Sequence, residues 1–127
     1  MFSAEVQNAL DRDLTIDITM TGRRSRRPRK LEIWFHRFDG RYFITGNPGP
    51  RDWYANLLSN PNFTFHLKES AKADLPARAR PVTDPEEKRR VLLGADSIWD
   101  KPNELTVDEW VRHSPMVEVI FENGGGE

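Results

Sequence analysis

Residues 30–45 read "KLEIWFHRFDGRYFIT", two aromatic-rich runs on either side of Asp39-Gly40. Asp-Gly between two such runs favours a type I′ turn, because that turn requires positive φ at both of its central residues. The stretch therefore predicts an antiparallel β-hairpin whose strands cover residues 30–38 and 41–45. This hairpin decides the fold class, since only antiparallel strands can be joined by so short a turn.

The turn also predicts which residues face each other, because the turn type sets the register of the two strands. Counting outward from the turn places Trp34 near Thr45 and Phe35 near Ile44. A parallel sheet or a helix in this segment would contradict the whole interpretation.

Four further segments are expected to be strands. The first two alternate apolar and polar residues, which is the period of a half-buried strand. These segments cover residues 14–20, 62–68, 73–82 and 116–122. The prolines of 73–82 are expected at the strand ends or at a sheet edge, because proline cannot donate a ladder hydrogen bond.

Short helices are expected where capping residues precede a helical pattern. They cover residues 3–12, 52–59, 83–94 and 106–113. The expected caps and capping-box partners are Ser3, Asp52, Asp84 with Glu87, and Thr106 with Glu109. In the second helix Trp53, Asn56 and Leu57 would share one face, because they are spaced three and four residues apart.

A chain of 127 residues is expected to fold as one domain. We assign it to residues 1–122 and expect the glycine-rich end, 123–127, to be disordered. About six strands joined mainly by hairpins predict an α+β fold that is mainly β. The antiparallel sheet would close into a small barrel, with short helices at its periphery.

Composition restricts the location and the chemistry of the protein. Hydrophobic residues make up 37% and charged residues 31% of the chain, and there is no cysteine for a disulfide or a thiol nucleophile. No run of 18 apolar residues occurs, and the first residues lack the apolar core of a signal peptide. We therefore expect a cytoplasmic protein without stable membrane insertion.

The loop before the hairpin is strongly basic. Residues 21–35, "TGRRSRRPRKLEIWF", place six positive charges within residues 23–30, although the formal net charge of the chain is −1. Such a run is often a solvated turn. However, its charges repel one another, and arginine suits phosphate and carboxylate, so the loop also fits an anion site. The near-neutral chain disfavours nucleic acid as the anion.

Other chemistry is poorly represented. The three histidines, His36, His66 and His113, lie in separate elements without the spacing of metal ligands. No nucleophile elbow, zinc-protease motif, P-loop or dinucleotide glycine motif occurs. We predict no metal and assign no catalytic side chain.

Four segments in order, "TGRRSRRPRKLEIWF", "DGRYFITG", "DWYANLLSNPNFTFHL" and "ARARPVTDPEEKRR", resemble the deazaflavin-dependent nitroreductase family. The resemblance covers about residues 15–92 and implies a split β-barrel that binds coenzyme F420, a flavin analogue with a phosphate and several carboxylates in its tail. Arg26 stands where the family pattern has glycine after the serine.

The resemblance also implies which residues bind the cofactor. In the family, two basic loop positions face the phosphate, three strand residues lie beside the ring, and a loop and a helix complete the site. Arg51 would supply the charge of a family lysine. The implied cofactor-binding residues are Arg24, Arg29, Glu32, Ile33, Trp34, Thr45, Gly46, Asn47, Arg51, Trp53 and Asn56.

The resemblance implies an F420-dependent reductase that transfers a hydride from reduced F420 to a quinone, an enone or a nitro-aromatic acceptor. Its partners would be small molecules rather than nucleic acid, and it would be a monomer or a homodimer. Two alternatives remain: an FMN-binding split-barrel reductase, and a non-enzymatic module that binds an anion, nucleic acid or a cofactor. Trp99 and Trp110 are candidates for acceptor contacts by residue type, although core packing is the more common role.

Overall fold

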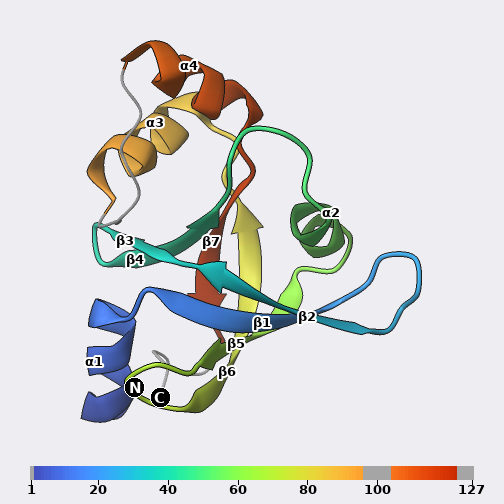
Figure 1. Ribbon diagram of the computed structural model, residues 1–127, viewed down its shortest axis with the longest axis vertical. Coiled ribbons are helices and arrows are strands. Elements are labelled where there is room, and N and C mark those ends of the chain that lie inside the picture. The colour runs from blue at the N-terminus through green and yellow to red at the C-terminus, as the bar shows by residue number, and fades with distance from the viewer. Residues whose placement is uncertain (1, 96–103, 123–127) are drawn as a thin grey trace.

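The computed structural model describes residues 2–95 and 104–122, without the side chains of 104–106. Within these residues the chain forms seven strands and four helices (Figure 1). The strands are β1 Thr15–Thr21, β2 Pro28–Trp34, β3 His36–Phe38, β4 Arg41–Thr45, β5 Asn62–Leu67, β6 Ala73–Pro81 and β7 Met116–Phe121. The helices are α1 Ala4–Arg12, α2 Asp52–Ser59, α3 Pro85–Gly94 and α4 Glu104–His113. Trp99 and the expected disordered end at residues 123–127 lie outside the described residues.

The two strands at opposite ends of the sheet are consecutive in the chain. The strand order is β2-β1-β5-β6-β7-β4-β3, and all neighbours are antiparallel. β2 ends at Trp34 and β3 begins at His36, so Phe35 alone joins the two edges. The sheet must therefore curl until these edges meet, and Figure 1 shows the chain passing from β2 directly into β3. The fold is the mainly antiparallel α+β split β-barrel that the sequence predicted, with seven strands rather than about six.

The Asp39-Gly40 turn is confirmed. Both residues have positive φ, 55° and 70°, and Phe38 pairs with Arg41 across the turn. The single strand expected over 30–38 was wrong, because the chain changes sheet edge at Phe35.

As a result, the β3–β4 ladder ends at His36, which pairs with Phe43. Trp34 pairs with Thr15 of β1 instead of continuing the ladder toward Thr45. Trp34 and Thr45 nevertheless line the same cavity.

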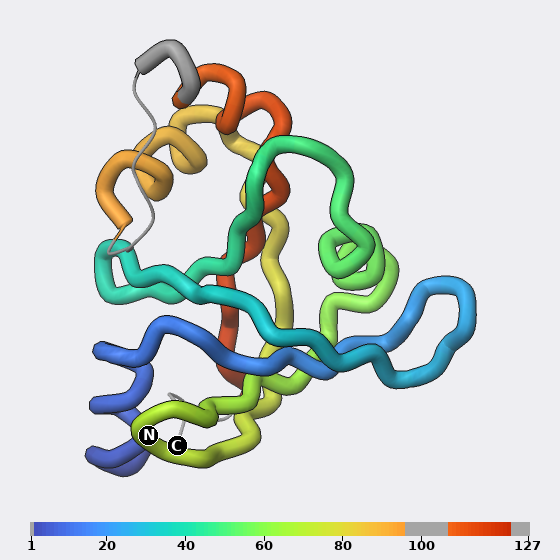
Figure 2. Tube along the Cα trace, viewed as in Figure 1, coloured from blue at the N-terminus to red at the C-terminus, as the bar shows by residue number. Residues whose placement is uncertain are grey.

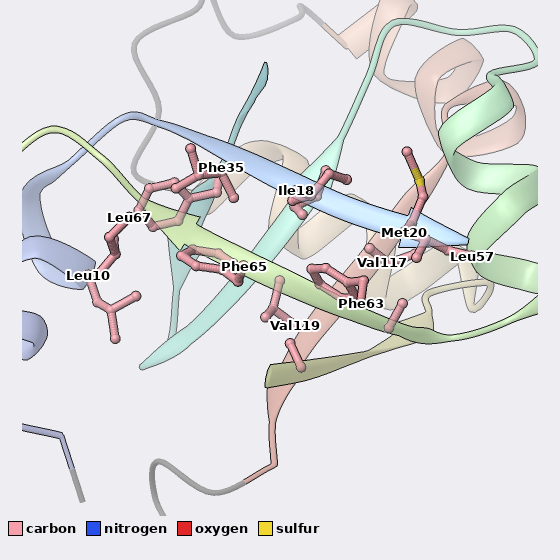
Figure 3. Packing of buried hydrophobic residues seen from close by; sticks show 14 of the residues in the cluster. Leu10, Ile18, Met20, Phe35, Leu57, Phe63, Phe65, Leu67, Val117 and Val119 are labelled. Atoms are coloured by element: carbon pink, nitrogen blue, oxygen red, sulfur yellow. The ribbon is translucent and has the colours of Figure 1, made fainter. Parts of the chain in front are cut away.

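The main core lies inside the curled sheet. Alternate residues of β1, Ile16, Ile18 and Met20, are buried, and Ile18 pairs with the buried Phe65 of β5. Figure 3 shows Ile18, Met20 and Phe65 in one cluster with labelled side chains of α1, α2 and β7. Each fully buried large apolar side chain stabilises the fold by about 1.5–3 kcal/mol. The alternation in the sequence therefore correctly predicted which side of these strands faces the core.

A second core lies between the α3–α4 pair and the sheet. Val91 of α3 and Val107 of α4 pack with Phe43 of β4 and Met116 of β7. The two helices thereby cover β4 and β7 at the end of the sheet opposite α1 (Figure 1). None of the helices in the described part of the chain is long and apolar enough to cross a membrane.

Two helix caps are confirmed. Ser3 Oγ accepts from the Val6 backbone N–H at 3.2 Å, and Asp84 Oδ1 accepts from the Glu86 N–H at 3.2 Å. The capping box expected from Glu87 is wrong, because Glu87 Oε2 accepts hydrogen bonds from two guanidinium groups. A carboxylate binds a guanidinium group more strongly than it binds a single backbone N–H.

The other two helices begin elsewhere than the sequence predicted. Asp52 is the first residue of α2 rather than its N-cap, and Arg51 occupies the cap position without a side-chain cap bond. The Asp52 carboxylate instead pairs with Arg23, 3.3 Å away. α4 begins at Glu104, so Thr106 lies inside the helix and is not its cap.

Pro76 lies in the middle of β6, and β6 is a central strand. The expectation that the prolines of this segment lie at strand ends or at an edge therefore holds for Pro81 only. Pro76 is tolerated because its carbonyl and nitrogen point toward β7 just beyond the last ladder pair, Ala77–Phe121. There its carbonyl accepts from the Glu122 N–H at 3.2 Å, and no ladder donor is required of its nitrogen.

Candidate functional site

The basic loop between β1 and β2 is held by its own backbone. The Gly22 N–H donates to the Arg27 carbonyl and the Arg26 N–H to the Gly22 carbonyl, both at 2.9 Å. A Cβ on Gly22 would lie 2.7 Å from Ser25 Oγ, so a larger residue there would displace the Ser25 side chain. Arg26 has a φ of 62°, a left-handed conformation that glycine adopts without cost, which explains glycine at this position of the family pattern. Figure 2 shows the loop projecting beyond the sheet near α2.

Arg23 anchors this loop to α2. Its backbone N–H and its Nη1 both donate to Asn56 Oδ1, at 3.1 and 2.9 Å, and its Nη2 donates to Asp52 at 3.3 Å. Asn56 is buried on the face of α2 that Trp53 and Leu57 share, as the sequence predicted. Its side chain therefore positions the loop.

The loop and α2 enclose a cavity of about 350 Å³, which we call the arginine cavity. Its lining residues are Met20, Gly22, Arg23, Arg24, Ser25, Arg29, Lys30, Leu31, Asp52, Trp53 and Asn56. Arg24 and Arg29 are exposed, and neither forms an ion pair with a carboxylate of the described residues. Their guanidinium groups are therefore available to an external anion.

A second cavity, of about 460 Å³, lies where β2 meets β4 and the loop that follows it. We call it the aromatic cavity, and its lining residues are Glu32, Ile33, Trp34, His36, Thr45, Gly46, Asn47, Arg51 and Trp110. Thr45 Oγ1 donates to the Pro115 carbonyl at 2.6 Å, and the Gly46 N–H donates to the same oxygen at 3.4 Å. These bonds fix the loop wall against the chain after α4.

The walls of the two cavities come together near Gly46. A Cβ built on Gly46 would lie 3.8 Å from both Arg51 Nε, which lines the aromatic cavity, and Trp53 Cζ2, which lines the arginine cavity. Trp53 is 7% exposed and packs edge-on against Tyr54 with ring centroids 5.9 Å apart. A ligand with a flat ring and a charged tail could therefore occupy both cavities across this junction.

Glu32, at the rim of the aromatic cavity, belongs to an ion cluster. The Lys68 ammonium donates to Asp17 Oδ1 at 2.8 Å and also to Glu32 Oε2. The hydrogen bond from Lys68 lowers the pKa of Asp17. In turn, the hydrogen bonds to Asp17 and Glu32 raise the pKa of Lys68. Lys68 thus offsets part of the negative charge of Glu32, although Asp17 shares the same ammonium.

The structure divides the eleven sequence-predicted residues between the two cavities. Four line the arginine cavity: Arg24, Arg29, Trp53 and Asn56. Seven line the aromatic cavity: Glu32, Ile33, Trp34, Thr45, Gly46, Asn47 and Arg51. Their roles toward a cofactor stay predictions.

Sequence reasoning missed Arg23 and His36 as cavity residues. Arg23 was counted among the loop charges, but its bond to Asn56 depends on a contact 33 residues away. Trp110, a candidate by residue type, both packs against the second core and lines the aromatic cavity, and its contact with an acceptor stays a prediction. His36 is 3% exposed and borders the same cavity. Among the described residues no group of three His, Cys, Asp or Glu side chains could hold a metal ion.

Three solved structures with the same fold are a hypothetical protein, an F420 reductase and an FAD-binding protein. A conserved hypothetical protein from Mycobacterium tuberculosis has a TM-score of 0.75 at 17% identity, covering 97% of this chain and 82% of that one. An F420 reductase has a TM-score of 0.67 at 16% identity, with 96% of each chain covered. An FAD-binding protein from Mesorhizobium loti has a TM-score of 0.69 at 12% identity, covering 97% and 91%. These identities establish a shared fold.

The family comparison is more specific. The model of the F420H(2)-dependent quinone reductase family matches residues 2–100, which include both cavities except Trp110. This match agrees with the resemblance found in the sequence. The protein is therefore an oxidoreductase whose cofactor is coenzyme F420, and the chain belongs to the F420H(2)-dependent quinone reductase family.

Proposed function

We propose that the protein transfers a hydride from reduced F420 to a quinone, an enone or a nitro-aromatic compound. The observation that carries this proposal is the junction of the arginine cavity with the aromatic cavity at Gly46 and Trp53. One cavity offers unpaired guanidinium groups and the other a partly apolar wall, which are the two environments that a charged tail and a flat ring require.

The residues present fit F420. The arginine cavity has four cationic side chains and one carboxylate, Asp52, which is already paired with Arg23. Arg24 and Arg29 would therefore hold the tail phosphate and carboxylates through charge-assisted hydrogen bonds. Ile33 and Trp34 would lie along the ring, and the loop at Gly46 would admit it closely because no side chain projects there.

When bound, the reduced cofactor supplies the hydride, since in such enzymes the cofactor carries the redox chemistry. The protein contributes position and solvent exclusion. Trp110, which also lines the aromatic cavity, would form an aromatic wall for the acceptor. We assign no side chain as general acid. The proton that completes reduction of a quinone to a hydroquinone would come from solvent, to which the cavity opens at Trp34, 39% exposed.

The test begins with binding. F420, FMN and a short duplex DNA are titrated in parallel against the parent protein, followed by fluorescence. F420 should bind most tightly, because FMN lacks the glutamate tail that the arginines would neutralise. Tighter binding of FMN, or of DNA with a steep salt dependence, would contradict the assignment.

Variants then locate the tail. Arg24→Ala and Arg29→Ala should each weaken F420 binding by about 1.5–3 kcal/mol, the contribution of one charged hydrogen bond. Arg27→Ala is the matched control, because Arg27 belongs to the same loop but does not line the arginine cavity. Equal losses from all three variants would indicate a diffuse electrostatic effect. Oxidation of reduced F420 by menadione, measured at 420 nm, tests the hydride transfer.

A further inference from the structure

A third cavity, of about 770 Å³, is larger than either cavity of the cofactor site. It lies between residues 48–50, the start of α3 and the last turn of α4 with the segment that follows. Its walls are tied together by the Gly49 N–H, which donates to the His113 carbonyl at 3.0 Å, and the Val82 N–H, which donates to the Met116 carbonyl at 2.9 Å. The volume falls within the range of about 300–1,000 Å³ that is typical of small-molecule sites.

Most of the cavity lining is apolar. The apolar side chains come from three parts of the chain, the loop after β4 with the start of α2, the segment before α3, and the end of α4. They are Pro48, Pro50, Tyr54, Val82, Pro85, Val111 and Pro115. This lining would accommodate the hydrocarbon body of a ligand.

One cationic group, the ammonium of Lys88, is buried at this cavity. Lys88 is 7% exposed, and its Nζ donates to the Ser114 carbonyl at 2.6 Å. No carboxylate of the described residues lies within ion-pair distance of that Nζ, and burial lowers the pKa of the ammonium. An ammonium has three N–H donors, so a single carbonyl satisfies only part of its capacity. Burying a charge without a counter-charge is costly, and lysine is almost never buried this way.

Ser114 adds a second buried polar group. Its Oγ is buried and has no hydrogen-bond partner among the described residues, and Ser114 lines the same cavity. Buried hydroxyl groups are normally hydrogen-bonded, so an orphaned one beside an uncompensated cation calls for an explanation. A ligand that carries both a negative charge and acceptor oxygens would satisfy the two groups together.

We propose that this cavity binds a small organic carboxylate, with its carboxylate group at Lys88 Nζ and Ser114 Oγ and its apolar body against the proline-rich wall. A monoanion balances the single buried cation, whereas a phosphate dianion would leave an excess buried charge. At the surface, Glu109 lies beside Arg112 and His113, and all three side chains are exposed, so the rim adds little net attraction. The specificity therefore rests on the buried pair.

The proposal is tested by calorimetric titration of the parent protein with acetate, benzoate and 2-naphthoate, with benzyl alcohol as the neutral counterpart of benzoate. At least one carboxylate should bind, more tightly with a larger apolar body, and benzyl alcohol should bind more weakly. Lys88→Met keeps the side-chain length and should weaken carboxylate binding about tenfold or more, equivalent to about 1.4 kcal/mol. Ser114→Ala should weaken it less.

Arg90→Met is the matched control, because Arg90 is an exposed cation of α3 that does not line the cavity, and it should leave binding unchanged. The titration is repeated with F420 present at saturation. Carboxylate binding that persists places the site outside the cofactor cavities, and this result is independent of whether the proposed reaction occurs. Three results would overturn the proposal: no binding by any of the three carboxylates, unchanged binding to Lys88→Met, or loss of binding when F420 is added.

Discussion

Arg23 gives two hydrogen bonds to one oxygen of Asn56, one from its backbone N–H at 3.1 Å and one from its guanidinium at 2.9 Å. A buried side chain of α2 thereby fixes the start of the basic loop between β1 and β2. Because Arg23 is bound to Asn56, the loop holds Arg24 and Arg29 beside the arginine cavity.

Asn56→Ala should therefore lower the free energy of unfolding by about 1–3 kcal/mol, because the Arg23 N–H and guanidinium lose their shared acceptor. F420 binding should also weaken, since Arg24 is no longer held in place. Asn56→Asp retains an acceptor oxygen and should preserve most of the stability. Urea unfolding and F420 titration measure the two effects. If the alanine variant matches the parent in both, Asn56 does not anchor the loop.

Substitutions at Gly46 test whether F420 binds where the two cavities meet. A Cβ there would meet its nearest neighbours at 3.8 Å, an ordinary contact distance, so Gly46→Ala should fold and bind F420 much as the parent does. The larger side chain of Gly46→Leu would project between Arg51 and Trp53, where the cavities join. We expect a strong loss of F420 affinity, with a melting temperature close to that of the alanine variant. Normal affinity in the leucine variant would exclude this junction from the site.

Acid stability should depend on Glu87 and Glu118, which both bind Arg41 and Arg80. The hydrogen bond from Arg80 lowers the pKa of Glu87. Burial alone would raise the pKa of Glu118, but the hydrogen bonds from Arg41 and Arg80 outweigh burial, and the pKa of Glu118 is lowered. Carboxyl groups with a lowered folded-state pKa stabilise the fold above their unfolded value of about 4.5. This stabilisation is lost as the pH falls through the lower folded values.

The melting temperature, followed by circular dichroism, should accordingly be constant near neutral pH and fall below about pH 4.5. Glu118→Gln should be less stable than the parent at pH 7 by about 1–3 kcal/mol, because two charged hydrogen bonds are weakened. The difference between the two proteins should shrink toward pH 3. A constant difference across the range would mean that Glu118 contributes by packing rather than by charge.

Gly40 tests the turn that defines the hairpin. Its φ is 70°, and a Cβ added there would meet no atom within 4 Å, so any cost of Gly40→Ala arises from backbone conformation alone. We expect a destabilisation of about 1–2 kcal/mol in urea unfolding. Gly40→Asn should cost less, because asparagine tolerates the left-handed region. A neutral alanine variant would show that the turn can change type.

Local patterns predicted the elements well because each depends on neighbours in the sequence. The alternation at Ile16 and Ile18 and the Asp39-Gly40 turn are of this kind, and both are confirmed. The break at Phe35 was not predictable in this way. Residues 30–38 contain no glycine or proline to signal a break, and only the return of the chain to the far edge of the sheet ends one strand and starts another.

The same distinction holds for the site. A family pattern could indicate Arg24 and Trp53, because it records which positions line a cavity. It could not reveal that Asn56 accepts hydrogen bonds from Arg23. Nor could it show that Glu87 binds Arg41 and Arg80 instead of capping its helix, or that Lys88 is buried beside Ser114. Each of these depends on which residues the fold brings together.

The single-residue joint at Phe35 also limits how the length of this chain can vary. Phe35 is 1% exposed, and its N–H donates to the Leu14 carbonyl at 3.1 Å, so it has no slack to absorb an insertion. One extra residue between Trp34 and His36 would shift β3 by one position and exchange its inner and outer faces. Natural variation in this protein should therefore include many substitutions at exposed β2 positions such as Lys30, but no insertion or deletion at this joint.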